Sequence, residues 1–97
     1  MINSLNIKID ELKIIKIVTV KSLRDFILDN ALIENDTLLI NTNNIDDITL
    51  EFRDTYGESI KHPYFLLGVL IEEDTSGKVK KGHIGIIRDD ARQESIR

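Results

Sequence analysis

Carboxylates at helical spacing are the side chains in this sequence best placed to do chemistry. Asp47, Glu51, Asp54 and Glu58 follow one another at intervals of four, three and four residues, so a helix would place them on one face. Such a face could dock a basic protein partner or mimic nucleic-acid phosphates. It could also be an ordinary solvated face, which is the commoner use of charge runs. Like charges four residues apart repel by about 0.2–0.5 kcal/mol, and we take this cost as favouring a partner-binding role.

The same region offers an alternative function, a metal-dependent phosphoester enzyme that uses Asp46, Asp47, Glu51 and Asp54. Magnesium and calcium are held by carboxylate oxygens that converge on one point, whereas carboxylates along an exposed helix face fan outward. We therefore expect no metal, no cofactor and no catalytic residue.

Histidine and serine chemistry gives a weaker signal. His62 and His83 are the two histidines, and either could serve as a general base near neutral pH. The sequence has no Gly-x-Ser-x-Gly motif to supply a nucleophile. We expect both histidines to be ordinary surface or half-buried residues.

A basic cluster near the C-terminus offers a third function. Lys78, Lys80 and Lys81 lie close together, and Arg88 could join them to form a phosphate-binding patch. Lysines at exposed strand ends also deter edge-to-edge pairing, and we favour this interpretation. A nucleic-acid or nucleotide binder is therefore an alternative, and we do not expect nucleic acid as a partner.

Charge is segregated along the chain. Residues 1–24 carry a net charge of +3, residues 25–76 carry −10, and residues 77–97 carry +3. Segregated charge governs partner choice and association rate rather than fold. We therefore expect a small non-catalytic protein-binding module, of the inhibitor, immunity or adaptor type, whose acidic middle binds a basic partner.

Size and composition set the broad class. The 97 residues suit one domain, and 17 isoleucines with 11 leucines favour strands. Cysteine is absent, and the longest apolar run, residues 65–71, is far shorter than the roughly 20 residues of a membrane span. We find no targeting segment, and we expect a cytoplasmic protein without a membrane segment.

The expected elements begin with strands at residues 5–9 and 12–20, the second apolar on both faces or bulged near Ile14. A helix should start at an N-cap on Ser22, present Leu23, Phe26, Ile27 and Ala31 on one face, and end by Ile33. Residues 37–41 are typical of a short strand.

Residues 44–57 fit two structures. Asn44 as N-cap, Gly57 after the last turn, and Ile45, Ile48, Phe52 and Tyr56 on one face predict a helix. Ile48, Leu50 and Phe52 also alternate with polar residues, as in a strand. The helix leaves Leu50 exposed, and we favour it because both caps and four apolar positions agree.

The last elements should form a hairpin of a central strand at residues 64–71 and a strand at residues 79–88, followed by a frayed tail at residues 89–97. Together these elements predict a two-layer α+β sandwich, in which a mixed or mostly antiparallel sheet of four or five strands carries one or two helices on one face. Because two strands are apolar on both faces, we expect a homodimer.

Overall fold

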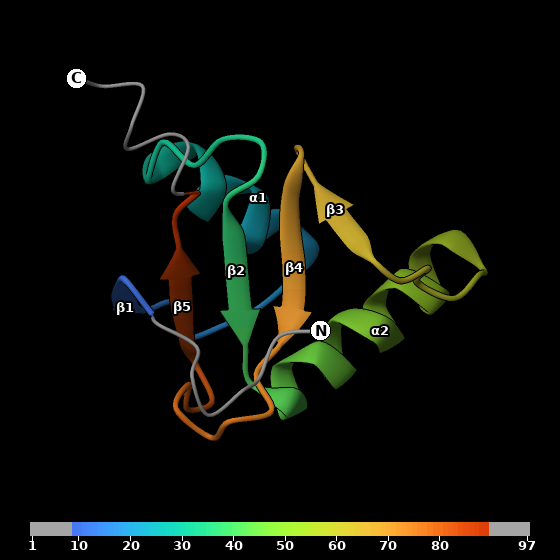
Figure 1. Cartoon of the computed structure of the whole chain (residues 1–97). Coiled ribbons are helices and arrows are strands. Elements are labelled where there is room, and N and C mark those ends of the chain that lie inside the picture. The colour runs from blue at the N-terminus through green and yellow to red at the C-terminus, as the bar shows by residue number, and fades with distance from the viewer. Residues whose placement is uncertain (1–8, 90–97) are drawn as a thin grey trace.

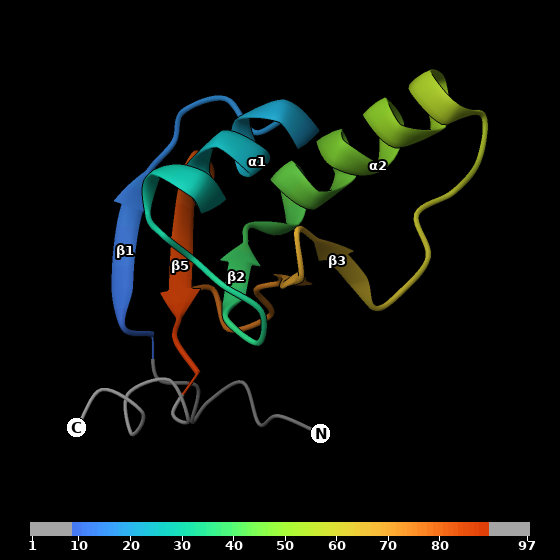
Figure 2. The ribbon, with the colours of Figure 1, turned by 90° about the horizontal axis from the view of Figure 1, so that it is seen from above.

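Five strands and two helices form two layers in the computed structural model, which describes residues 9–89. The elements are β1 Glu11–Ile14, α1 Val20–Asp29, β2 Thr37–Ile40, α2 Thr42–Tyr56, β3 Tyr64–Leu66, β4 Val69–Glu73 and β5 His83–Ile87. Both helices lie on the same side of the sheet (Figure 1, Figure 2). The predicted α+β sandwich is therefore confirmed. The strand expected at residues 5–9 and the tail expected at 89–97 fall almost wholly outside the described residues.

The sheet has the order β1-β5-β2-β4-β3. β2 and β4 are parallel, and the pairs β1–β5, β2–β5 and β3–β4 are antiparallel. The hairpin predicted between residues 64–71 and 79–88 is wrong, because β2 lies between β4 and β5. The loop that joins β4 to β5 therefore crosses the end of β2.

The predicted central strand at residues 64–71 is two strands joined by a tight turn. Leu67 and Gly68 both have positive φ, 53° and 82°, as in the type I′ turns that match the twist of paired strands. Gly68 supplies the backbone freedom that this turn requires. Gly85 permits a close approach of neighbouring side chains, because an added Cβ would lie 3.1 Å from Val79 Cγ2 and 3.4 Å from Leu39 Cβ.

The predicted strand at residues 12–20 is too long, since β1 ends at Ile14. The chain turns at Lys16, which has a φ of 69°, and Thr19 then begins α1 as its N-cap. Ser22, predicted as the N-cap, is the third helical residue and completes the capping box with Thr19. Ala31 lies beyond the helix and is exposed, whereas the apolar face of α1 is buried.

The ambiguity at residues 44–57 is resolved as a helix, α2. Its N-cap is Asn41 rather than Asn44, and Gly57 ends it with the expected left-handed conformation. Ile48 is buried and Leu50 is exposed, as the helical pattern requires. The C-terminal half of α2 extends past the edge of the sheet at β3 (Figure 2). No helix within residues 9–89 is both long and apolar enough to cross a membrane.

The core lies between the helices and the covered face of the sheet. Its fully buried members include residues of α1, β2, α2 and β5, namely Leu23, Ile27, Leu38, Ile40, Ile48, Ile84 and Ile86. Full burial of one such side chain stabilises the fold by roughly 1.5–3 kcal/mol relative to exposure. This core holds α2 against the sheet and so fixes its position beside β4.

Candidate partner-binding groove

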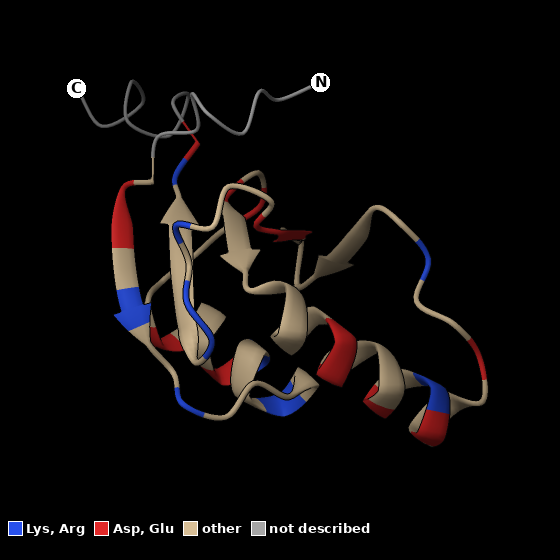
Figure 3. Ribbon diagram, turned by 90° about the horizontal axis from the view of Figure 1, so that it is seen from below, with Lys and Arg blue, Asp and Glu red and all other residues tan. Residues whose placement is uncertain are grey.

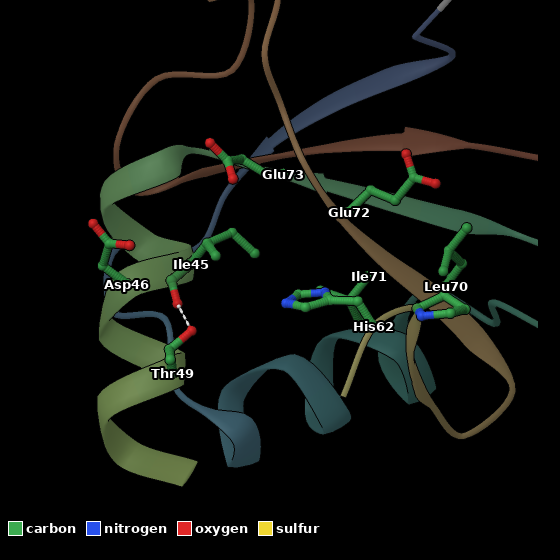
Figure 4. A pocket seen from close by; sticks show the side chains of 9 residues that line it. Ile45, Asp46, Thr49, His62, Leu70, Ile71, Glu72 and Glu73 are labelled. Atoms are coloured by element: carbon green, nitrogen blue, oxygen red, sulfur yellow. Dashed lines mark hydrogen bonds between the residues drawn. The ribbon is translucent and has the colours of Figure 1, made fainter. Parts of the chain in front are cut away.

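A groove of about 650 Å³ lies between the first half of α2 and the end of β4. Figure 4 shows its labelled side chains arranged around an open space, with the His62 ring between the helix and the strand. The lining residues are Ile45, Asp46, Thr49, His62, Pro63, Leu70, Ile71, Glu72 and Glu73. Three of them carry carboxylates, and none is lysine or arginine.

The topology of the sheet creates this groove. The crossover from β2 through α2 to the parallel strand β4 places the helix alongside that strand. β3 pairs with β4 only from Tyr64 opposite Ile71 to Leu66 opposite Val69. Glu72 and Glu73 extend beyond this pairing, so the groove opens where β3 stops covering β4.

One residue of β4, Glu73, directs both of its backbone groups away from β2. The amides of Leu70 and Asp74 donate to the carbonyls of Asp36 and Ile40, at 3.1 and 2.8 Å, on the β2 side. Because hydrogen-bonding direction alternates along a strand, the N–H and C=O of Glu73 point to the β3 side. No described residue of β3 lies opposite Glu73. The Glu73 backbone is therefore placed to bind an added extended segment.

The groove combines an apolar floor with acidic walls. On the helix side, Ile45 is half-buried and Ile71 is buried, whereas the register of β4 with β2 places the side chains of Leu70 and Glu72 on the opposite face of the sheet. Asp46 and Glu73 are exposed, and the Glu73 carboxylate accepts a hydrogen bond of 2.7 Å from the Thr42 hydroxyl. Thr42, the first residue of α2, thus orients the carboxylate of Glu73. This lining suits a ligand with an aliphatic stem and a cationic head.

The predicted acidic face of α2 is only partly a free surface. Asp47 and Asp54 are exposed on α2, whereas Glu58 is exposed but lies beyond Gly57, which ends the helix. Acidic segments run along the helix in Figure 3. Glu51 differs, because its carboxylate accepts the Val20 amide at 3.0 Å and so satisfies the first turn of α1. The expectation that Glu51 points to solvent is wrong.

The alternative metal site does not assemble within residues 9–89. No group of three or more histidines, cysteines or carboxylates there is arranged to hold a metal ion. Asp46 lines the groove while Glu51 contacts the start of α1. The carboxylates assigned to phosphoester chemistry therefore point to different parts of the molecule.

The predicted basic cluster is also divided. Lys78, Lys80 and Lys81 are exposed on the loop before β5, whereas Arg88 follows the opposite end of that strand. Arg88 forms an ion pair of 2.8 Å with Glu11. The structure thus separates Arg88 from the lysines. His83, the first residue of β5, lies 3.2 Å through Nδ1 from the Lys81 carbonyl.

Buried polar side chains anchor the loop between β4 and β5 to the start of α2. Asp74 accepts the amides of Val79 at 2.7 Å and Ser76 at 3.0 Å. Burial raises the pKa of Asp74, but hydrogen bonds from the Ser76 hydroxyl and from the Val79, Ser76 and Lys78 amides hold it below its ordinary value. Asn44, predicted as an N-cap, is buried and accepts the Gly82 amide at 2.9 Å.

An aromatic cluster supports the projecting half of α2. Phe52 contacts Tyr56 and Tyr64, with ring centroids 4.7 and 6.2 Å apart. Burial raises the pKa of Tyr64, and Tyr56 and Glu51 add to the rise. The cluster links α2 to β3 near the His62–Pro63 segment of the groove.

The sequence prediction missed most of the groove. It identified Asp46 and His62 individually, but not their proximity to Glu72 and Glu73. The available signal was the acidic run at residues 72–74 directly after an apolar strand, together with Asp46 and Asp47 in the first half of the predicted helix. Comparison with protein-family models, curated proteins and solved structures gives no match to this chain.

Proposed function

We propose that this protein is a non-catalytic module that binds a basic, extended segment of a protein partner in the groove between α2 and β4. The observation that carries the proposal is the lining of the groove, with carboxylates at Asp46, Glu72 and Glu73 and no lysine or arginine. Inhibitors, immunity proteins and adaptors bind partners in this stoichiometric way.

The chemistry of the groove favours lysine or arginine side chains. Their aliphatic stems can cover Ile45 while their cationic heads reach the carboxylates of Asp46 and Glu73, which lie on the helix side of the sheet. The outward-facing backbone of Glu73 adds a donor and an acceptor for an extended chain. Side-chain charge and backbone pairing thus favour the same ligand.

The outer carboxylates of α2 have a separate role in this proposal. Asp47, Asp54 and Glu58 are exposed and lie outside the groove lining. Exposed charges beside a binding site steer encounter and affect the association rate more than the final affinity. They would therefore attract a basic partner without holding it.

A matched pair of charge variants tests the proposal. The probe is a short peptide in which lysine alternates with valine, with a glutamate–valine peptide as negative control. The groove variant combines Asp46→Asn, Glu72→Gln and Glu73→Gln. The control variant combines Asp47→Asn, Asp54→Asn and Glu58→Gln, and so removes the same charge from the outer face.

Calorimetry should show roughly tenfold weaker binding for the groove variant, because three partly exposed charge pairs contribute about 0.5 kcal/mol each. The outer-face variant should lose less than about threefold in affinity. Equal losses would indicate unspecific attraction to an acidic protein, and absence of binding to the parent protein would reject the proposal.

Two further expectations from the sequence stay proposals. One is the cytoplasmic location. The other is the homodimer, whose original basis was two strands apolar on both faces, at residues 12–20 and 64–71; the structure ends the first at Ile14 and divides the second into a hairpin. Exposed Leu12 and Ile14 on β1 now provide a different basis for self-association.

A further inference from the structure

The outer edge of β1 has exposed apolar side chains and, within residues 9–89, hydrogen-bonding groups without a strand partner. Leu12 and Ile14 are 56% and 67% exposed. The β1–β5 register places Lys13 opposite Ile84, and the Ile15 amide donates to the Gly82 carbonyl at 2.8 Å. Because bonding direction alternates, the N–H and C=O groups of Leu12 and Ile14 point away from β5. No described residue pairs with them.

The two faces of β1 carry different chemistry. Glu11 and Lys13 lie on the helix side, opposite the core residues Ile86 and Ile84 of β5. Lys13 there donates to the side chain of Asn30 at the end of α1. Leu12 and Ile14 therefore lie on the other face. The helix side of β1 thus carries one negative and one positive residue, the sequence neighbours of Leu12, and the other face carries apolar residues.

We propose that this edge binds the same edge of a second copy, so that two sheets join through antiparallel β1 strands. The two-fold axis passes through Leu12, which then lies opposite Leu12 of the partner subunit. In this register Glu11 faces the partner's Lys13, and Lys13 faces the partner's Glu11. The backbone N–H and C=O groups of Leu12 and Ile14 point toward the β1 strand of the partner subunit.

Charge selects this register over its neighbours. With a two-fold axis perpendicular to the sheet, the two β1 strands can also pair in registers shifted by two residues, in which the helix layers of both copies still lie on the same side. The adjacent registers place Lys13 opposite the partner's Lys13, or Glu11 opposite the partner's Glu11. Like charges directly opposite one another destabilise a strand pair, whereas opposite charges contribute roughly 0.2–1 kcal/mol. Only the register centred on Leu12 makes two favourable pairs.

The other edge of the sheet is a poorer site for a second copy. β3 has three residues, and two of them pair inward through Tyr64 opposite Ile71 and Leu66 opposite Val69. Only Phe65 directs its backbone outward, and Pro63, which precedes the strand, has no N–H to donate. The proposal deepens the self-association stated above and is independent of the groove and its basic partner.

Sedimentation velocity at about 100 μM protein tests the interface. The parent protein should be a dimer, and Leu12→Lys should be a monomer because it places two cations at the two-fold axis. Phe65→Lys is the matched control on β3, with 54% exposure at the parent residue, and it should leave the dimer intact. A monomeric parent would overturn self-association itself.

A charge swap then tests the register. Lys13→Glu should weaken dimerisation by roughly tenfold, because both cross-strand pairs become like-charged. Adding Glu11→Lys to Lys13→Glu, together with Arg88→Glu to keep the ion pair at residue 11, restores opposite charges and should restore the dimer. A dimer that tolerates both Leu12→Lys and Lys13→Glu would overturn this interface while leaving self-association elsewhere and the groove proposal unaffected. Slow exchange of the Leu12 and Ile14 amides in dilute monomer would also overturn it, since a segment of the same chain would then cover the edge.

Discussion

The two edges of the sheet present different chemistry. The β1 edge alternates apolar residues with residues of opposite charge, Glu11 and Lys13, so its surface is complementary to itself. The β3–β4 edge stops short at Pro63, and beyond it Glu72 and Glu73 border a groove that carries only negative formal charge. The first edge therefore fits a second copy, and the second fits a basic ligand.

The difference shows how one small sheet can separate two kinds of contact. Open strand edges invite pairing with other chains unless length, charge or proline blocks them. β3 has three residues and follows a proline, whereas β1 has four residues and no proline, and its charges, Glu11 and Lys13, are of opposite sign and can pair with those of a second copy. Selectivity at each edge then depends on the side chains beside the open backbone rather than on the backbone itself.

Breaking the loop between the two edges should have the largest effect on stability. Asp74→Ala removes a buried acceptor of the Val79 and Ser76 amides, and hydrogen bonds to charged groups contribute about 1.5–3 kcal/mol each. We expect the free energy of unfolding in urea to fall by about 2–4 kcal/mol. A change within about 0.5 kcal/mol, the range of neutral surface substitutions, would show that the loop is not anchored by Asp74.

Acid should loosen the same loop before it affects the β1 edge. The folded pKa of Asp74 is lowered, so its contribution to stability is complete above the unfolded pKa of about 3.9 and is lost as pH falls through the lower folded value. The amide resonances of Val79 and Ser76 should titrate in that range, while that of Ile15, which donates to the Gly82 carbonyl, stays constant. Asp74→Asn should abolish the titration, and its persistence in that variant would contradict the assignment.

Two charge reversals on α2 should differ by a smaller amount. Glu51→Lys removes the acceptor of the Val20 amide and should cost about 1–2 kcal/mol of stability, comparable to loss of a helix cap. Asp54→Lys changes an exposed residue and should stay within about 0.5 kcal/mol of the parent. Thermal melts of the two single variants measure the difference, and equal melting temperatures would mean that the Glu51 contact contributes nothing.

Local sequence patterns predicted the elements better than their partners. The apolar face of α1, the strand β2 and the helix α2 with Gly57 at its end all follow from spacing and capping within a few residues. The pairing of β4 with β2, in place of β5, depends on contacts between distant segments. No local pattern specifies such contacts. The turn at Leu67 and Gly68, which divides the strand predicted at residues 64–71, was also missed.

The candidate site shows the same limit. Acidity in the middle of the chain was evident from the sequence, and the spacing of carboxylates on α2 was correctly assigned to a helix. The groove itself depends on the parallel crossover that brings Asp46 beside Glu73. Glu51 was misassigned because its partner, the Val20 amide, lies 31 residues away in sequence.

The most direct test of the groove is to observe where a basic ligand binds. In a titration of ¹⁵N-labelled protein with the lysine–valine peptide, the account predicts that amide shifts concentrate at Thr49, His62 and residues 70–73, with the Glu73 amide shifted as it gains a hydrogen bond. Shifts that concentrate instead at Asp54 and Glu58, or that spread evenly over all acidic segments, would contradict the central claim that the groove between α2 and β4 is the partner-binding site.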